Sequence, residues 1–101
     1  LNNYYRRIVN IHPALLPSYG GKGMYGAKVH EAVIANGDRE SGITIHYVNS
    51  FYDEGDIIFQ ASCKIEPGDT ADTLASKIHE LEYRHFPVVI EKLVAALPDE
   101  N

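Results

Sequence analysis

The stretch NIHPALLP at residues 10–17 decides how the rest of this sequence is interpreted. Residues 7–11 are rich in β-branched side chains and predict a short strand, which Pro13 ends because proline cannot donate to a sheet. Asn10 and His12 are two residues apart, so both side chains point to the same face of an extended chain. An amide beside an imidazole at a strand end suits chemistry at a carbonyl carbon, where charge develops on oxygen and a proton moves.

The composition is that of one acidic, globular domain. The chain has 101 residues, is 45% hydrophobic and carries a net charge of -5 at pH 7. Lys and Arg are scattered apart from the pair Arg6-Arg7, which argues against a nucleic-acid partner. No apolar run approaches the roughly 20 residues of a membrane span, and no signal peptide is visible. The single Cys63 excludes an internal disulfide and is compatible with the cytoplasmic location that we expect.

The periodicity predicts strands and a helix around two loops. Residues 13–27 form a loop rich in glycine and proline, which is long enough to be functional. Residues 28–36 predict a short helix that ends at an Asn-Gly pair. Apolar and polar side chains alternate in residues 42–48 and again in 56–65. This pattern predicts two antiparallel strands, and we expect the loop between them to be functional. One face of the second strand is expected to carry Ile57, Phe59, Ala61, Cys63 and Ile65.

The C-terminal third predicts helix. Asp69 or Thr70 can cap its start, and Asp72 places negative charge in the first turn. Pro87 is expected to break or kink this helix and to serve as the first position of a second one. The apolar stripe has a helical period and includes Leu74, Ile78, Leu81, Ile90, Leu93, Val94 and Leu97.

Three polar residues fall at predicted strand ends. Asn10 and His12 follow the first strand, and Asp53 lies in the loop between the next two. Groups at strand ends of an α/β sheet tend to gather in one crevice. There, an amide can bind an oxyanion, an imidazole can move a proton, and a carboxylate can tune the imidazole.

Three motifs in order resemble one enzyme family. NIHPALLP at 10–17, GITIHYV at 42–48 and YDEGDII at 52–58 resemble the phosphoribosylglycinamide formyltransferases, over residues 8–95. These enzymes of purine synthesis transfer a formyl group from 10-formyltetrahydrofolate to the amine of glycinamide ribonucleotide. The resemblance implies an α/β fold, the C-terminal part of a formyltransferase-type Rossmann-like sheet with flanking helices and an antiparallel strand pair.

The resemblance also implies roles for individual residues. Asn10 matches the catalytic amide that donates to the formyl oxygen, and His12 the imidazole that stabilises the oxyanion and helps to move protons. Asp53 matches the carboxylate that supports the charge of this histidine. Glu82 matches a glutamate that binds the ribose hydroxyls, and His79 falls at a substrate-side position. The folate pterin pocket is matched by Val48, Asn49, Ser50, Phe51 and Tyr52.

The family needs no metal or nucleotide cofactor, and its folate acts as a co-substrate. Its phosphate-binding loop and first parallel strands lie upstream of residue 1. The glycine-rich run at 20–23 lacks the spacing of a Walker loop and does not replace them. Because the chain also starts at Leu1 without methionine, we expect residues 1–101 to be the catalytic, folate-binding C-terminal half of a formyltransferase domain.

Other interpretations remain open at this point. A 10-formyltetrahydrofolate hydrolase uses the same three residues with water as acceptor, whereas a methionyl-tRNA formyltransferase is disfavoured by the pattern at 46–48. The chain could also be an inactive half that needs a complementary half or a second copy of itself.

Simpler roles compete for the polar side chains. Asn10, His12 and Asp53 could merely shape turns. His46 is expected to be a hydrogen-bonded structural histidine, His85 a packed side chain and Cys63 an inert core thiol. His30 is expected to be a solvated surface residue, and the alternative is a buffering histidine near the cleft. The spacing of the histidines and Asp53 matches no standard metal-ligand pattern.

Overall fold

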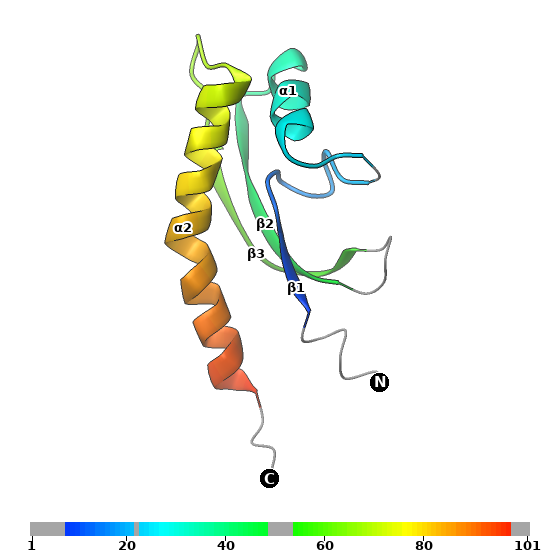
Figure 1. The fold of residues 1–101 in the computed structure, drawn as a ribbon, viewed down its shortest axis with the longest axis vertical. Helices are drawn as coiled ribbons and strands as arrows, with labels where there is room; N and C mark the ends of the chain where they lie inside the picture. Colours follow the sequence, from blue (N-terminus) through cyan, green and yellow to red (C-terminus); the bar gives the residue numbers. More distant parts are fainter. Residues whose placement is uncertain (1–7, 22, 49–53, 98–101) are drawn as a thin grey trace.

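The computed structural model describes residues 8–21, 23–48 and 54–97. In this part of the chain, three strands and two helices follow one another (Figure 1). They are β1 (Val9–His12), α1 (Ala27–Ala35), β2 (Glu40–Val48), β3 (Glu54–Lys64) and α2 (Ala71–Ala96). The predicted order of elements is therefore confirmed as far as the start of α2, with ends that differ by a few residues.

The strands form one antiparallel sheet in the order β1-β2-β3. Strands β2 and β3 are antiparallel, as the sequence predicts, and their pairing begins with Glu40 opposite Lys64. Strand β1 is short and pairs with the C-terminal part of β2, so that His12 lies opposite Thr44. Helix α2 runs along one side of the sheet, and α1 lies beside the N-terminal end of α2 (Figure 1).

The central strand β2 is buried on both faces. Its residues 41–46 are all buried, including the polar Thr44 and His46. Ile43 belongs to the apolar face and packs into the core of the domain. That core joins α1 and α2 to the sheet and contains Ala14, Val29, Val33, Ile43, Leu74, Ile78 and Leu81.

A β-bulge changes the predicted face of β3. Ile45 lies opposite Phe59, but the next residue, His46, lies opposite Ile57, so Ile58 is an extra residue on β3. The prediction that Ile57 shares the apolar face is wrong, because Ile57 lies opposite His46 and is 50% exposed. An extra residue reverses the alternation beyond it, and sequence periodicity alone does not reveal that.

Helix α2 continues through Pro87, so the prediction of a second helix is wrong. It is one helix of 26 residues. Proline in a helix costs about 3 kcal/mol, because it removes a hydrogen bond and crowds the preceding turn. Leu81 and Val89 are buried on either side of Pro87, and Pro87 itself is exposed. Packing of both segments against the same sheet offsets this cost.

Gly42 shows how closely the layers approach one another. A Cβ atom at this position would overlap the carbonyl oxygen of Ala61 on β3 and lie 2.8 Å from Cδ2 of Leu15. The segment after His12 is thus pressed against β2, and only glycine leaves room for it.

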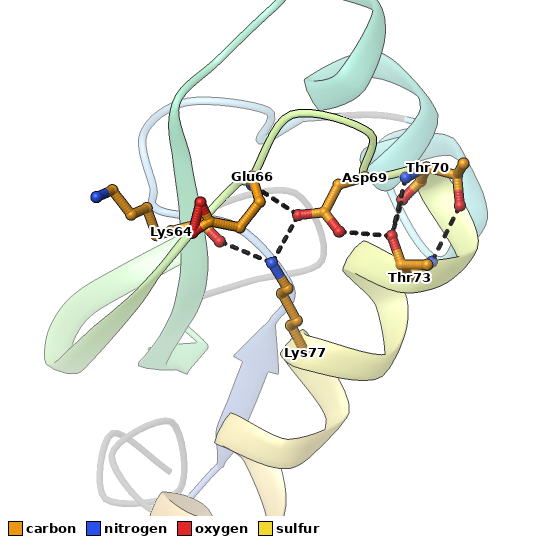
Figure 2. A network of polar contacts seen from close by, with 6 residues as sticks. All are labelled: Lys64, Glu66, Asp69, Thr70, Thr73 and Lys77. Atoms are coloured by element: carbon orange, nitrogen blue, oxygen red, sulfur yellow. Dashed lines mark hydrogen bonds and ion pairs between the residues drawn. The ribbon is translucent and has the colours of Figure 1, made fainter.

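The start of α2 is fixed by reciprocal hydrogen bonds (Figure 2). The hydroxyl of Thr70 accepts from the backbone N–H of Thr73 at 3.2 Å, and the hydroxyl of Thr73 accepts from the N–H of Thr70 at 2.8 Å. This capping box satisfies two backbone donors that the helix cannot pair internally. The predicted cap is confirmed.

Asp69 joins this cap to the preceding turn (Figure 2). Its carboxylate accepts from Lys77 Nζ at 2.6 Å, from the N–H of Glu66 at 2.7 Å and from the Thr73 hydroxyl at 2.8 Å. The Lys77 ammonium also donates to the carbonyl oxygen of Lys64, the last residue of β3. These contacts, with Lys77 first, lower the pKa of Asp69 to about 2.

We expect Thr70→Ala to destabilise the domain by about 1 kcal/mol, or roughly 4–8 °C in Tm, because it removes the cap. Thr70→Ser should restore most of the loss. Ser76→Ala, further along the same helix, is the control and should leave Tm nearly unchanged, since alanine favours helix. Thermal unfolding followed by circular dichroism measures all three. Equal Tm values for Thr70→Ala and Ser76→Ala would contradict the role of the cap.

Candidate active site

The polar face of the sheet brings the first predicted site residues together. Asn10 lies opposite His46, and His12 lies opposite Thr44, so these four side chains share one face. Gln60 extends this face onto β3, where it lies opposite Thr44. Asn10 is exposed, whereas only 8% of His12 is accessible. An open amide therefore stands beside a largely enclosed imidazole.

The ring of His12 is oriented by the loop that follows it. Its Nε2 lies 2.8 Å from the backbone carbonyl oxygen of Tyr19. A carbonyl oxygen can only accept, so Nε2 carries the hydrogen and donates. Nδ1 is then the ring nitrogen that remains available for other partners.

Thr44 holds the segment between His12 and that loop. Its hydroxyl is fully buried, donates to the carbonyl oxygen of Ala14 at 2.7 Å and accepts from the N–H of Leu16 at 2.9 Å. The amide of Gln60 donates both to this hydroxyl at 2.9 Å and to the carbonyl oxygen of Leu16 at 3.0 Å. All hydrogen-bonding positions of the Thr44 hydroxyl are used.

His46 is a buried histidine with one ring nitrogen occupied. Its Nδ1 donates to the carbonyl oxygen of Tyr47 at 2.8 Å, which fits the prediction of a structural, hydrogen-bonded residue. Its Nε2 is buried and has no hydrogen-bond partner within the residues described. With the hydrogen on Nδ1, Nε2 of the neutral ring is an acceptor, at the strand position opposite Asn10.

The other predicted site residues are placed less completely. Val48 ends β2 and is half-buried. The remaining loop positions, residues 49–53 with Asp53 among them, lie outside the described residues. Glu82 is half-buried and His79 is exposed, both on α2, whose core residues pack on the apolar face of the sheet. The structure thus unites Asn10 and His12 but does not bring these two α2 residues onto their face.

A cavity of about 240 Å³ separates the N-terminal turns of α1 and α2. His30 and His79 line it from opposite helices, together with Glu31 and Asp72. The expectation that His30 is solvated is wrong, because only 4% of it is accessible. Its position on the core side of a short helix, next to Val29 and Val33, explains this burial. Burial lowers the pKa of His30, and the nearby His79 lowers it further.

Two smaller predictions hold. The ring of His85 packs against Phe59 with centroids 5.0 Å apart. Cys63 packs against the core, and burial raises the pKa of its thiol, as expected for an unreactive cysteine.

Among the residues that the structure describes, no three His, Cys, Asp or Glu side chains could hold a metal ion together. In the same part of the chain, neither helix is long and apolar enough to cross a membrane.

Tyr19, Thr44 and Gln60 were not predicted as site residues. Thr44 and Gln60 alternate with apolar neighbours, as many exposed strand residues do, so the sequence has no local sign of their shared hydrogen bonds. Tyr19 acts on His12 through its backbone carbonyl, which any residue type could provide. A tyrosine in a glycine-rich loop is the only hint that the sequence offers.

Burial of His30 predicts that the domain loses stability in mild acid. Its folded-state pKa lies below the ordinary value of 6.5, so the unfolded chain binds more protons as pH falls below that value. Urea unfolding at pH 7.5 and 5.5 should show this loss in the wild type, at no more than about 1.4 kcal/mol per pH unit.

His30→Leu should reduce the dependence on pH, because it removes the buried titrating group. His79→Asn is the control and should retain most of it, since burial, the larger cause, remains. The same pH dependence in wild type and His30→Leu would show that His30 does not titrate across unfolding.

Comparison with known proteins shows which family this chain resembles in sequence and fold. A family model described as formyl transferase matches residues 1–90. A phosphoribosylglycinamide formyltransferase of Arabidopsis thaliana, named as chloroplastic, is 48% identical over 85 residues, 84% of this chain and 29% of that protein. The crystal structure of a phosphoribosylglycinamide formyltransferase from Bacillus halodurans superimposes with a TM-score of 0.79 at 40% identity, over 93% of this chain and 46% of that one.

A formyltetrahydrofolate deformylase from Pseudomonas syringae pv. tomato has a similar fold. Its crystal structure superimposes with a TM-score of 0.80 at 25% identity and covers 98% of this chain and 32% of that one. This chain therefore spans less than half the length of each of these three relatives. The predicted fold class, part of a formyltransferase-type α/β domain, is confirmed.

Proposed function

Because this chain belongs to the formyl transferase family, we propose that it supplies the catalytic half of a phosphoribosylglycinamide formyltransferase. The complete enzyme would move a formyl group from 10-formyltetrahydrofolate to the amine of glycinamide ribonucleotide. One observation carries the proposal: the exposed Asn10 amide and the oriented, enclosed His12 imidazole share one face at the end of β1. The names of the Arabidopsis and Bacillus relatives support the choice of substrates.

In the proposed reaction the substrate amine attacks the formyl carbon directly. A carbon–nitrogen bond forms, and negative charge develops on the formyl oxygen. Asn10 donates a hydrogen bond to this oxygen, and His12, as an imidazolium, stabilises it. The bond from the formyl carbon to the tetrahydrofolate nitrogen then breaks. The proton that the amine loses reaches that leaving nitrogen, so no protein nucleophile is needed.

The orientation of the His12 ring suggests a separate role for each ring nitrogen. Since Nε2–H donates to the Tyr19 carbonyl, Nδ1 is left to meet the formyl oxygen or the carboxylate of Asp53. Asp53 would offset the positive charge of His12 and relay a proton through a water molecule. A carboxylate near an imidazole favours its charged form.

The remaining assignments concern binding. Glu82 would accept from the ribose hydroxyls, and His79 would lie on the substrate side. Val48 and residues 49–52 would line the folate pterin pocket. Residues 1–101 would form the C-terminal half of the domain, with the phosphate site in a complementary N-terminal half. We also propose that the protein is cytoplasmic, which its acidic composition and single cysteine support. The Arabidopsis relative, by contrast, is named as chloroplastic.

Hydrolysis of 10-formyltetrahydrofolate is the second candidate function. The similarity to a formyltetrahydrofolate deformylase favours it, because water could replace the amine as acceptor with the same three residues. The higher identity to the Bacillus halodurans transferase, 40% against 25%, favours transfer.

The experiment supplies the complete protein with 10-formyltetrahydrofolate, with and without glycinamide ribonucleotide, and measures formylated product and free formate. A transferase should give formylated product when glycinamide ribonucleotide is present. It should release little formate when this amine is absent. Formate released at the same rate in both reactions would replace transfer with hydrolysis. The 101-residue chain alone, assayed with and without the complementary half, tests whether that half is required.

We expect Asn10→Ala and His12→Ala each to lower kcat by roughly 100–1000-fold, because each removes a group that stabilises the oxyanion. Circular dichroism and Tm should show that both variants remain folded. Ser62→Ala, at an exposed position of β3, is the control and should keep full activity. Turnover within a few-fold of wild type in either folded variant would remove that residue from the mechanism.

A further inference from the structure

The loop between β1 and α1 contains a residue in an unusual backbone conformation. Tyr19 has φ of 58°, in the left-handed region, and is the only residue other than glycine with positive φ in the described part of the chain. A non-glycine residue pays roughly 1–2 kcal/mol for this conformation. It persists only where surrounding contacts hold it.

One of those contacts is with His12, the candidate catalytic histidine. The carbonyl oxygen of Tyr19 accepts from His12 Nε2 at 2.8 Å. The direction in which this carbonyl points therefore decides which ring nitrogen carries the hydrogen and how the ring is turned.

The side chain of Tyr19 is held at the opposite end, by the turn after α1. Its hydroxyl donates to Asp38 Oδ2 at 2.6 Å. Asn36 Nδ2 donates to the Tyr19 hydroxyl at 3.0 Å and to Asp38 Oδ1 at 2.8 Å. The hydrogen bond to Asp38 raises the pKa of Tyr19, because the carboxylate accepts from the protonated hydroxyl.

We infer that Tyr19 is a positioning residue for His12, held in place by Asp38 and Asn36. Its hydroxyl contacts offset the cost of the left-handed backbone, and that backbone aims the carbonyl at Nε2. Without the hydroxyl, the loop relaxes towards negative φ and the carbonyl turns away from the ring. The inference rests on the proposed function only where it concerns catalysis, since the contact with His12 can be measured without substrate.

The catalytic test compares Tyr19→Phe, Asp38→Ala and the double variant in the complete protein. Each single variant should lower kcat by roughly 10-fold, because a slight displacement of a catalytic group is costly, and should change KM little. The double variant should be no slower than either single one, because both remove the same contact. Tyr25→Phe is the matched control, a tyrosine of the same loop that is 67% exposed, and should behave as wild type.

The spectroscopic test uses ¹⁵N-labelled histidine, with the His12 signals assigned by comparison with His12→Gln. In the wild type and in Tyr25→Phe, the neutral ring should show hydrogen on Nε2 alone. In Tyr19→Phe, the two nitrogen shifts should move towards each other, as expected for mixed tautomers.

The outcomes separate the two proposals. Altered ¹⁵N shifts together with reduced kcat support the inference. Unchanged shifts in Tyr19→Phe, or altered shifts with kcat equal to that of Tyr25→Phe, overturn it. If the wild type transfers no formyl group, the proposed function fails, and the ¹⁵N shifts alone decide whether Tyr19 orients His12.

Discussion

The arrangement of this site depends on the hydrogen bonds of one fully buried group, the hydroxyl of Thr44. It lies in the middle of the central strand, opposite His12, and joins the backbone of Ala14 and Leu16 to the sheet. A buried backbone donor or acceptor without a partner costs about 1–3 kcal/mol. The segment after His12 can therefore leave the sheet at Pro13 and still be buried, because Thr44 and Gln60 satisfy its polar groups.

This contact fixes the site from one side and Tyr19 fixes it from the other. Thr44 holds the chain directly after His12, and seven residues later the Tyr19 carbonyl returns to the His12 ring. Gly42 allows the loop to approach, since any side chain there would meet Leu15 and Ala61. A loop rich in glycine and proline is thus held in a defined path by a few hydrogen bonds. Such preorganisation is what the proposed stabilisation of a developing oxyanion requires.

Local patterns were enough to predict most of the fold and the shared face of Asn10 and His12. Strand alternation predicted that Asn10 and His12 share a face, and cap chemistry predicted that α2 starts at Asp69 or Thr70, of which the structure has Thr70. The errors at Ile57, Pro87 and His30 have a common cause. A bulge, the packing that offsets a proline and the burial of one helix face all depend on residues distant in sequence. For the same reason, nothing local identified Thr44 or Tyr19 as part of the site.

The dependence of the site on the Thr44 hydroxyl is tested most directly by the unfolding free energies of Thr44→Val and Thr44→Ser. Valine matches the shape of threonine but leaves the Leu16 N–H and the Ala14 carbonyl without their partner. Serine keeps the hydroxyl and loses one methyl group. The structure predicts that the serine variant is the more stable of the two, by about 1–3 kcal/mol in urea denaturation. A valine variant as stable as the serine variant would contradict this dependence.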